Sequence, residues 1–213
     1  QRELFHEAFT IPYNKWCHRN GMLSRVQAYG RGLHTLESSM YIDIPECETW
    51  FGHHHGTSFP DNSMAGRGYT MDNKFVSSAA HLAGNPNVSC EEITNTGWVF
   101  NATLEKLKLT GDLSNLSGVN HSIFHGFNYS PKEAPFPGWL RYGTYFSERN
   151  PWWPYLRHWM DYKARLSAVL QNSEQQADVA ILPPVEDMWS KFGSQRDPFP
   201  QLTYPTYANT MWE

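Results

Sequence analysis

The segment Val88-Ser89-Cys90-Glu91-Glu92-Ile93-Thr94 constrains the fold most, because a short, β-prone, apolar start leads into two adjacent carboxylates. It follows a turn sequence, Asn85-Pro86-Asn87, and a helical pattern follows it, so we predict a buried strand. A buried carboxylate is costly unless it is paired or used. Because parallel α/β proteins place reactive groups at the carboxyl ends of their strands, this segment predicts an active site.

The rest of the chain alternates between strand-like and helix-like patterns. Strands are predicted at residues 22–29, 40–44, 88–94, 118–126 and 177–182, and helices at residues 1–19, 33–38, 68–83, 98–109 and 150–171. The first helix is expected to be interrupted near Pro12, and the last to be buried between layers. Alternation of this kind favours a parallel sheet. The glycine motifs of nucleotide-binding loops are missing.

Successive predicted strands each bring polar groups to one end of the sheet, which favours a (β/α)8 TIM-type barrel over an open sheet. These groups are Gln27, Asp43 with Glu46, Glu91 with Glu92, and Asn120 with His125. Four strands before the long helix cannot close an eight-stranded barrel. Residues 1–175 are therefore expected to be the C-terminal half of a barrel whose N-terminal half is missing, and residues 176–213 the start of a following α/β domain.

Composition narrows the classes of ligand. The net charge of −4 predicts no nucleic-acid footprint, and the longest apolar runs are too short to span a membrane. Aromatic residues make up 15% of the chain, which fits a large core and also a sugar-binding cleft, since many ligand pockets are rich in aromatic residues. Trp139 is our candidate for lining such a cleft.

Two carboxylates in sequence on a strand point to opposite faces, so only one of Glu91 and Glu92 can face the barrel mouth. The other is expected to be a solvated charge at the strand end. Glu46 and Glu48 are expected just beyond a strand that Pro45 ends, where they would cluster with Glu91. Such a cluster could supply the acid and base that flank a glycosidic bond, or hold calcium through oxygen ligands.

His125, a single histidine at a predicted strand end, is a further active-site candidate beside the alternative of a buried structural histidine. The run His53-His54-His55 is not favoured as a zinc site, because adjacent residues rarely ligate one ion well. No GxSxG motif is present, so a serine nucleophile is not indicated.

Several segments together resemble glycoside hydrolase family 106, the α-L-rhamnosidases and related polysaccharide-degrading bacterial enzymes. The similarity covers roughly residues 20–180 and lies in Arg25-Val26-Gln27-Ala28-Tyr29-Gly30, Asp43-Ile44-Pro45-Glu46-Cys47-Glu48, residues 88–94, Gly118-Val119-Asn120 with His125-Gly126, and Arg149-Asn150-Pro151-Trp152-Trp153. The order and spacing of these segments make the resemblance specific.

The resemblance implies a (β/α)8 barrel, an inverting two-carboxylate mechanism and a calcium ion near the sugar. It makes Glu91 the general base that activates water and Glu46 a calcium ligand, with Glu48 as substitute and Glu91 also in the metal's reach. Sugar contacts are expected from Gln27, Asn120, His125 and Trp139. No match to the family's general acid is found, so it is expected in the missing half. A secreted or periplasmic bacterial enzyme with an oligo- or polysaccharide substrate is implied.

Two other hypotheses stay open. The chain could belong to a barrel-derived module that binds sugar without cleaving it, which would lack an acidic partner facing Glu91. It could also belong to a retaining, β-galactosidase-like enzyme, whose carboxyl groups would lie about 5–5.5 Å apart rather than the roughly 6.5–9.5 Å of an inverting pair.

Overall fold

The computed structural model describes residues 2–28, 35–51, 67–95, 100–138 and 142–182. Its centre is a four-stranded parallel sheet in the sequential order β1-β2-β3-β4. The strands are β1 (Arg25–Val26), β2 (Ile44–Phe51), β3 (Ser89–Asn95) and β4 (His121–Phe124). The predicted parallel α/β architecture is confirmed.

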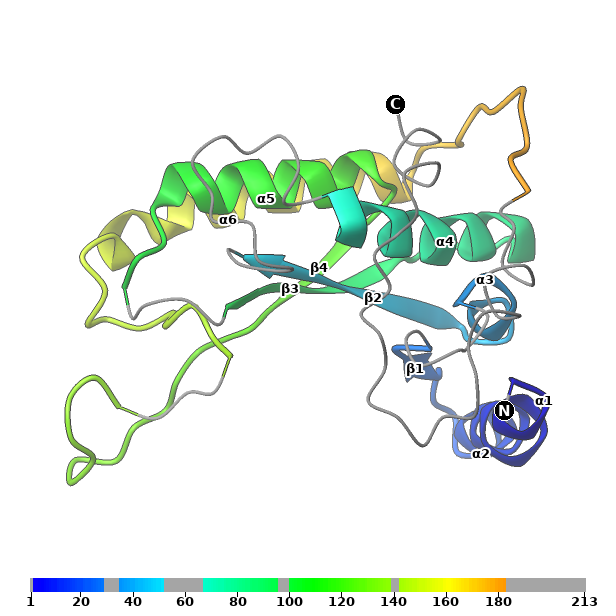
Figure 1. Cartoon of the computed structure of the whole chain (residues 1–213), viewed down its shortest axis with the longest axis horizontal. Helices are drawn as coiled ribbons and strands as arrows, with labels where there is room; N and C mark the ends of the chain where they lie inside the picture. Colours follow the sequence, from blue (N-terminus) through cyan, green and yellow to red (C-terminus); the bar gives the residue numbers. More distant parts are fainter. Residues whose placement is uncertain (1, 29–34, 52–66, 96–99, 139–141, 183–213) are drawn as a thin grey trace, which may run out of the picture.

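Helices connect the strands and cover one face of the sheet. They are α3 (Thr35–Ser39), α4 (Arg67–Ala83) and α5 (Leu104–Leu116), followed by the 3-10 turn η2 (Trp153–Tyr155) and α6 (Leu156–Gln171). Figure 1 shows α4, α5 and α6 on the same side of the sheet, with α5 and α6 side by side. None of the described helices is long and apolar enough to cross a bilayer.

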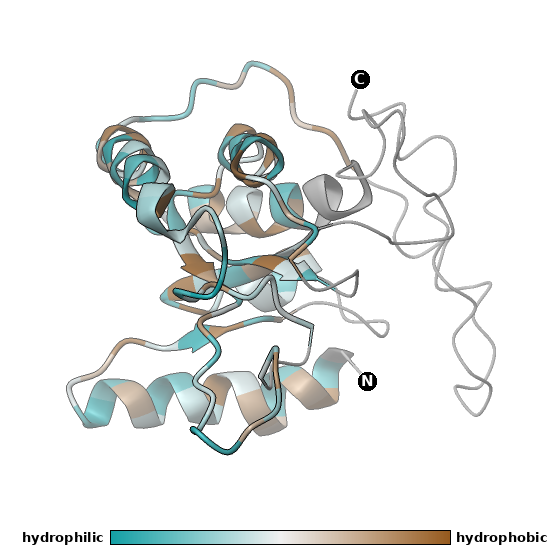
Figure 2. Cartoon of the chain, turned by 90° about the vertical axis from the view of Figure 1, so that its left-hand side faces the viewer, coloured by the Kyte–Doolittle hydropathy of each residue, from teal (hydrophilic) through white to brown (hydrophobic). Residues whose placement is uncertain are grey.

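The N-terminal helix lies beside β1, away from α4–α6 (Figures 1 and 2). It consists of α1 (Arg2–Phe5), the π-helical segment η1 (His6–Thr10) and α2 (Ile11–Arg19). The predicted interruption therefore takes the form of a π segment just before Pro12, whose ring removes a backbone donor without ending the helix. Asp43 fastens α2 to the sheet by accepting hydrogen bonds from Ser24 N (2.7 Å) and Ser24 Oγ (2.8 Å), with His18 Nε2 at 2.8 Å.

Two apolar clusters fill the space between the sheet and its helices. One surrounds the paired β2 and β3 cysteines and contains Cys47, Val76, Ala80, Val88, Cys90 and Val119. The other lies under α5 and α6 and contains Ile93, Ala102, Leu107, Phe146, Leu156 and Trp159. Helix α4 approaches closely enough that a Cβ on Gly118 would lie 2.6 Å from Ser77 Cβ, so glycine is required there.

The predicted position of β2 is wrong. The strand begins at Ile44, four residues later than expected, and runs through Pro45 instead of ending there. Pro45 is tolerated because pairing with β3 begins only at Glu46, so no ladder hydrogen bond to β3 needs its missing N–H. Consequently Glu46 and Glu48 lie within the strand, and Asp43 lies before its first residue and not at its carboxyl end as predicted.

Three further boundaries differ from prediction. Helix α5 starts at Leu104, where Thr103 caps it by accepting a hydrogen bond from Lys106 N, and it continues past Gly111. Helix α6 is buried on one side only, with Val169 63% exposed. The prediction that this helix is buried between layers is therefore wrong. Residues 177–182 form no strand, and Leu182 is 93% exposed, because nothing in the described structure pairs with them.

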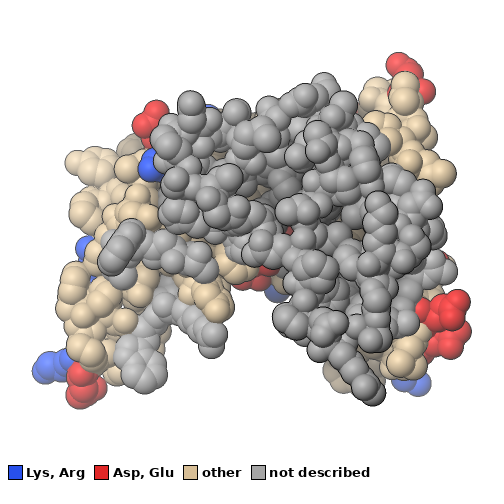
Figure 3. Space-filling view, viewed as in Figure 1, with Lys and Arg blue, Asp and Glu red and all other residues tan. Residues whose placement is uncertain are grey.

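Figure 3 shows described charged side chains mainly near the edges of one face of the molecule, where Lys and Arg lie close to Asp and Glu. Among the described residues on this face, Lys and Arg do not gather into one patch.

Candidate functional site

The face of the sheet opposite α4–α6, called the open face below, presents the carboxylates. The face covered by α4–α6 is called the helix face. Strand register pairs Glu46 with Ser89 and Glu48 with Glu91. Because side chains alternate along a strand, these four residues share one face, while Cys47, Thr49, Cys90 and Glu92 face the helices. Glu46, Glu48 and Glu91 therefore come from neighbouring strands to one surface, although Glu46 and Glu48 lie within β2 and not beyond its end as predicted.

Glu91 lies at the centre of a hydrogen-bonded cluster. Gln27 Nε2 donates to Glu91 Oε2 at 2.7 Å, and Thr94 Oγ1 donates to Glu91 Oε1 at 3.2 Å. His125 Nδ1 lies 3.1 Å from the same Oε1 atom. The Glu91 side chain is 29% exposed and that of His125 30%, so solvent reaches the carboxylate. The carboxylate is thus held in place and still open to a water molecule.

Glu46 lies beside Glu91 and shares a partner with it. Gln27 Nε2 also contacts Glu46 Oε1 at 3.1 Å, so one amide group bridges the two carboxylates. The other oxygen, Oε2, accepts from Ser89 Oγ at 2.6 Å and pairs with Arg25 Nε at 3.3 Å. The Glu46 side chain is only 9% exposed. The Glu46 carboxylate is therefore a largely buried acceptor that orders the Gln27 amide, which in turn contacts the more exposed Glu91.

A bulge in β3 brings Thr94 to this cluster. The register shifts so that Thr49 pairs with Glu92 but Trp50 pairs with Thr94, and Ile93 stands at φ 70°. The extra residue reverses the alternation, so Thr94 lies on the same face as Glu91 instead of the helix face. Bulges are over-represented next to active sites because they redirect side chains.

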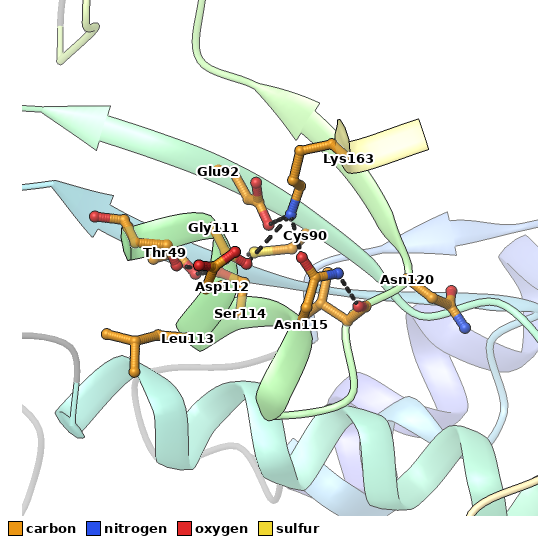
Figure 4. Close-up of polar contacts among 12 residues, drawn as sticks. Thr49, Cys90, Glu92, Gly111, Asp112, Leu113, Ser114, Asn115, Asn120 and Lys163 are labelled. Atoms are coloured by element: carbon orange, nitrogen blue, oxygen red, sulfur yellow. Dashed lines mark hydrogen bonds and ion pairs between the residues drawn. The ribbon is translucent and has the colours of Figure 1, made fainter. Parts of the chain in front are cut away.

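The opposite face of β3 has a different chemistry. Glu92 is fully buried and pairs with Lys163 Nζ of α6 at 3.0 Å. The same ammonium donates to Asn115 Oδ1 at 2.7 Å and to Gly111 O at 3.3 Å, both on α5 (Figure 4). Burial raises the pKa of Glu92, and the charge of Lys163 opposes that rise. The prediction of a solvated second carboxylate is therefore wrong.

The predicted substrate-binding residues separate into three groups. Gln27 and His125 join the Glu91 cluster, where both contact the Glu91 carboxylate, whereas the prediction was that they contact sugar. Asn120 does not join it: it precedes β4, and its side chain donates to Pro86 O at 2.8 Å and accepts from Val88 N at 2.8 Å, at the other end of the sheet. Trp139 and the residues 53–55 lie outside the described residues.

Thr94, Ser89 and Arg25 were missed as site residues by the sequence analysis. Ser89 and Arg25 could have been found, since each lies within a quoted motif and two residues from Glu91 or Gln27 along the chain. Thr94 could not, because strict alternation from Glu91 would place it among the helices.

The described residues do not fit the expected calcium site. Among them, no group of three His, Cys, Asp or Glu side chains is arranged to hold a metal ion. Each oxygen of Glu46 and Glu91 has an N–H or O–H donor or a cationic partner within reach, and Arg25 places a fixed positive charge next to Glu46. A calcium ligand set uses free carboxylate oxygens instead. The calcium expectation stays a prediction, and no chemical step below depends on it.

Fold and site together define an α/β protein with a carboxylate centre on the open face of a parallel sheet. The family model described as alpha-L-rhamnosidase, glycoside hydrolase family 106, matches residues 3–205. The chain therefore belongs to this family of glycoside hydrolases, which confirms the resemblance.

Two individual proteins are similar to this chain. One, from Formosa agariphila (strain DSM 15362 / KCTC 12365 / LMG 23005 / KMM 3901 / M-2Alg 35-1), is provisionally named a beta-glucuronidase and is 31% identical over 180 residues, which are 84% of this chain and 14% of that protein. The other is the solved structure of a rhamnosidase from Novosphingobium sp. PP1Y, with a TM-score of 0.68 at 23% identity over 81% of this chain and 16% of that one. The chain thus spans about one seventh of the length of these relatives, and the structural likeness supports the fold.

Proposed function

We propose that this chain forms the C-terminal half of a catalytic (β/α)8 barrel in a secreted or periplasmic enzyme that cleaves α-L-rhamnosidic or related deoxysugar linkages in polysaccharides. The observation that supports this most directly is the Glu91 carboxylate, ordered by Gln27, Thr94 and His125 but still partly exposed on the open face. Sequential strand order with the helices on one face also suits a barrel.

Glu91 acts as the general base. A carboxylate offers roughly four lone-pair directions. Gln27, Thr94 and His125, with its proton on Nδ1, occupy three of them, which leaves one for water. Glu91 takes a proton from that water while the water oxygen attacks the anomeric carbon on the face opposite the leaving group. An acid outside this chain protonates the departing glycosidic oxygen. The anomeric configuration is inverted.

Glu46 has a supporting role in this mechanism. Ser89, Arg25 and Gln27 all direct N–H or O–H groups or positive charge at its oxygens, which therefore serve as hydrogen-bond acceptors. Glu46 therefore fixes Gln27, and Gln27 in turn fixes Glu91. Glu48 pairs with Glu91 in the strand register and faces the same surface, and we propose that it contacts sugar hydroxyls.

The relative named as a beta-glucuronidase gives a second candidate substrate. A glucuronoside carries a carboxylate at the position where a rhamnoside carries a methyl group, and that carboxylate needs a cationic or N–H-rich partner. Arg25, with a side chain 46% exposed, lies at the edge of the site and could supply one.

The test uses the complete polypeptide that contains this chain. Aryl α-L-rhamnoside and aryl β-glucuronide are offered separately, and the first product anomer is followed by NMR. We expect rhamnose release with inversion. Release from the glucuronide alone would favour the second candidate, retention would favour the β-galactosidase-like mechanism, and a folded protein that binds oligosaccharide without release would be the binding module.

A separate experiment measures sugar release by the complete polypeptide with and without a calcium chelator. Because the described side chains do not fit the metal, we expect release to persist after chelation if no other calcium site exists in the complete protein. Loss of release that added calcium restores would place the ion on ligands outside the described residues.

A further inference from the structure

The bulge of β3 is a strained feature beside the proposed base. Ile93 is β-branched and fully buried, yet it stands at φ 70°, where such residues are genuine outliers. Strained residues of this kind persist only when their surroundings hold them, and they cluster at functional sites. The consequence of the strain is the position of Thr94, whose hydroxyl reaches Glu91 only because the bulge reverses the strand alternation.

Hydrogen bonds to the backbone carbonyls of Glu92 and Ile93 hold the bulge. Thr144 Oγ1 donates to Ile93 O at 2.7 Å, and His125 N donates to Glu92 O at 2.8 Å. The second bond links the bulge to the imidazole that contacts Glu91. A displacement of Glu92 would therefore move both Thr94 and His125, the two groups on Glu91 Oε1.

Lys163 is the cationic partner of Glu92 on the helix face of the sheet. Its ammonium has three acceptors, on Glu92, Asn115 and Gly111, and thus joins α6 and α5 to β3 (Figure 4). The side chains of Lys163 and Glu92 are only 4% and 0% exposed. Helix α5 accommodates the ammonium at a glycine, since a Cβ on Gly111 would lie 3.3 Å from Lys163 Nζ.

A buried ion pair is a poor way to gain stability, because well-packed apolar residues of similar volume serve as well or better. Its directional contacts do supply something that apolar packing lacks, namely a fixed position. We propose, on the basis of the proposed function, that Lys163 and Glu92 are positioning residues for Glu91: they clamp the β3 bulge and thereby hold Thr94 and His125 against the base.

The test replaces the clamp by apolar residues of similar size in the complete polypeptide. The double variant Glu92→Leu/Lys163→Met leaves no buried charge unpaired, so its melting temperature is expected to stay near that of the unaltered protein. We expect kcat to fall at least about tenfold while KM stays within about twofold, because the catalytic geometry is lost and not substrate binding.

Two further variants keep the test decisive. Gly111→Ala suits a helix and pushes gently on Lys163, so it is expected to fold and to lower kcat about threefold. Ser77→Ala is the matched control: it removes a buried hydroxyl of α4 that donates to Ser117 O behind the sheet, away from β3 and Lys163, so kcat should be unchanged. Unaltered kcat in the folded double variant, or an equal fall in the control, would overturn the proposal.

A crystal structure of the double variant, or of Gly111→Ala if the double variant does not fold, separates this proposal from the proposed function. We expect the contact between Thr94 Oγ1 and Glu91 Oε1 to be broken. If the unaltered protein releases no sugar, the proposed function fails, and the crystal structure still decides the positioning: a preserved contact would show that the clamp does not position Glu91.

Discussion

Glu91 and Glu92 are neighbours in the chain but belong to two different environments. Glu91 lies on the open face, is 29% exposed and contacts Gln27, Thr94 and His125. Glu92 lies on the helix face, is fully buried and pairs with Lys163. Because successive side chains of a strand point to opposite faces, two adjacent glutamates lie in different surroundings: one reaches solvent and the other lies in the core.

The difference shows how a sheet can position a reactive group from behind. On the open face, Gln27, Thr94 and His125 order the Glu91 carboxylate and leave it partly exposed. On the helix face, Lys163 contacts Glu92 and Ile93 belongs to the core, and we propose that these contacts hold the backbone of β3 behind Glu91. The two faces are thus predicted to respond differently to substitution.

The largest effect on stability is expected from Lys163→Met. Removing one partner leaves the Glu92 charge buried and unpaired, which costs about 3–5 kcal/mol in comparable pairs. Thermal melting of the complete polypeptide would show it. The exposed Lys106→Met on α5 is the control, and an equal small loss in both would mean that the helix face does not depend on the pair.

On the open face, His125→Ala is expected to lower kcat about 10–100-fold, because one group that orients the base is lost. The melting temperature should change little, since the side chain is 30% exposed. His121→Ala, at the start of β4 and outside the Glu91 cluster, serves as control in steady-state kinetics. A large loss of stability without loss of kcat would assign His125 to the fold instead.

Asp43→Asn tests the edge where α2 joins the sheet. Burial alone would raise the pKa of Asp43, but hydrogen bonds from Ser24 and His18 outweigh this and lower it below its ordinary value of 3.8. A lowered carboxyl pKa stabilises the fold above the unfolded pKa, and this contribution is lost as the pH falls through the folded pKa.

We therefore expect Asp43→Asn to cost about 1–2 kcal/mol at neutral pH. The difference from the unaltered protein should shrink below about pH 4. Melting curves between neutral and acidic pH give the comparison. A difference that does not change with pH would mean that the hydrogen-bonded charge is not its source.

The smallest effect is expected from Thr103→Ala at the start of α5. Loss of the cap on Lys106 N should cost about 1 kcal/mol. The helix that provides Asn115 and Gly111 to Lys163 should otherwise stay intact, so kcat is expected to be unchanged. Melting and kinetics on the same sample check both statements, and a fall in kcat would show that the clamp depends on the helix start.

Much of the fold could be predicted from the sequence because its signals are local. The strand at Glu91 and the helix over residues 67–83 follow from apolar periodicity, and parallel alternation follows from their order. The position of β2 could not be predicted, because whether Pro45 ends a strand depends on which neighbour pairs with it. The apolar run at 177–182 failed for a similar reason, since a strand requires a partner.

The site divides in the same way. Glu46, Glu91, Gln27 and His125 come together as the motifs predicted, although the contact of Gln27 and His125 with the carboxylate is a feature of three-dimensional packing. Thr94 depends on a bulge, which no alternating pattern shows. Lys163, 71 residues from Glu92 in the chain, gave no signal beyond a single charge within an apolar helix.

The most direct test of the account compares Glu91→Gln with Glu92→Gln in the complete polypeptide, with sugar release and thermal melting measured on each. We expect Glu91→Gln to lose about 1,000-fold in kcat at an unchanged melting temperature, as for removal of a general base. Glu92→Gln should show the lower melting temperature and the smaller loss of kcat. Near-normal turnover by Glu91→Gln would contradict the assignment of the base and with it the division of labour between the two faces.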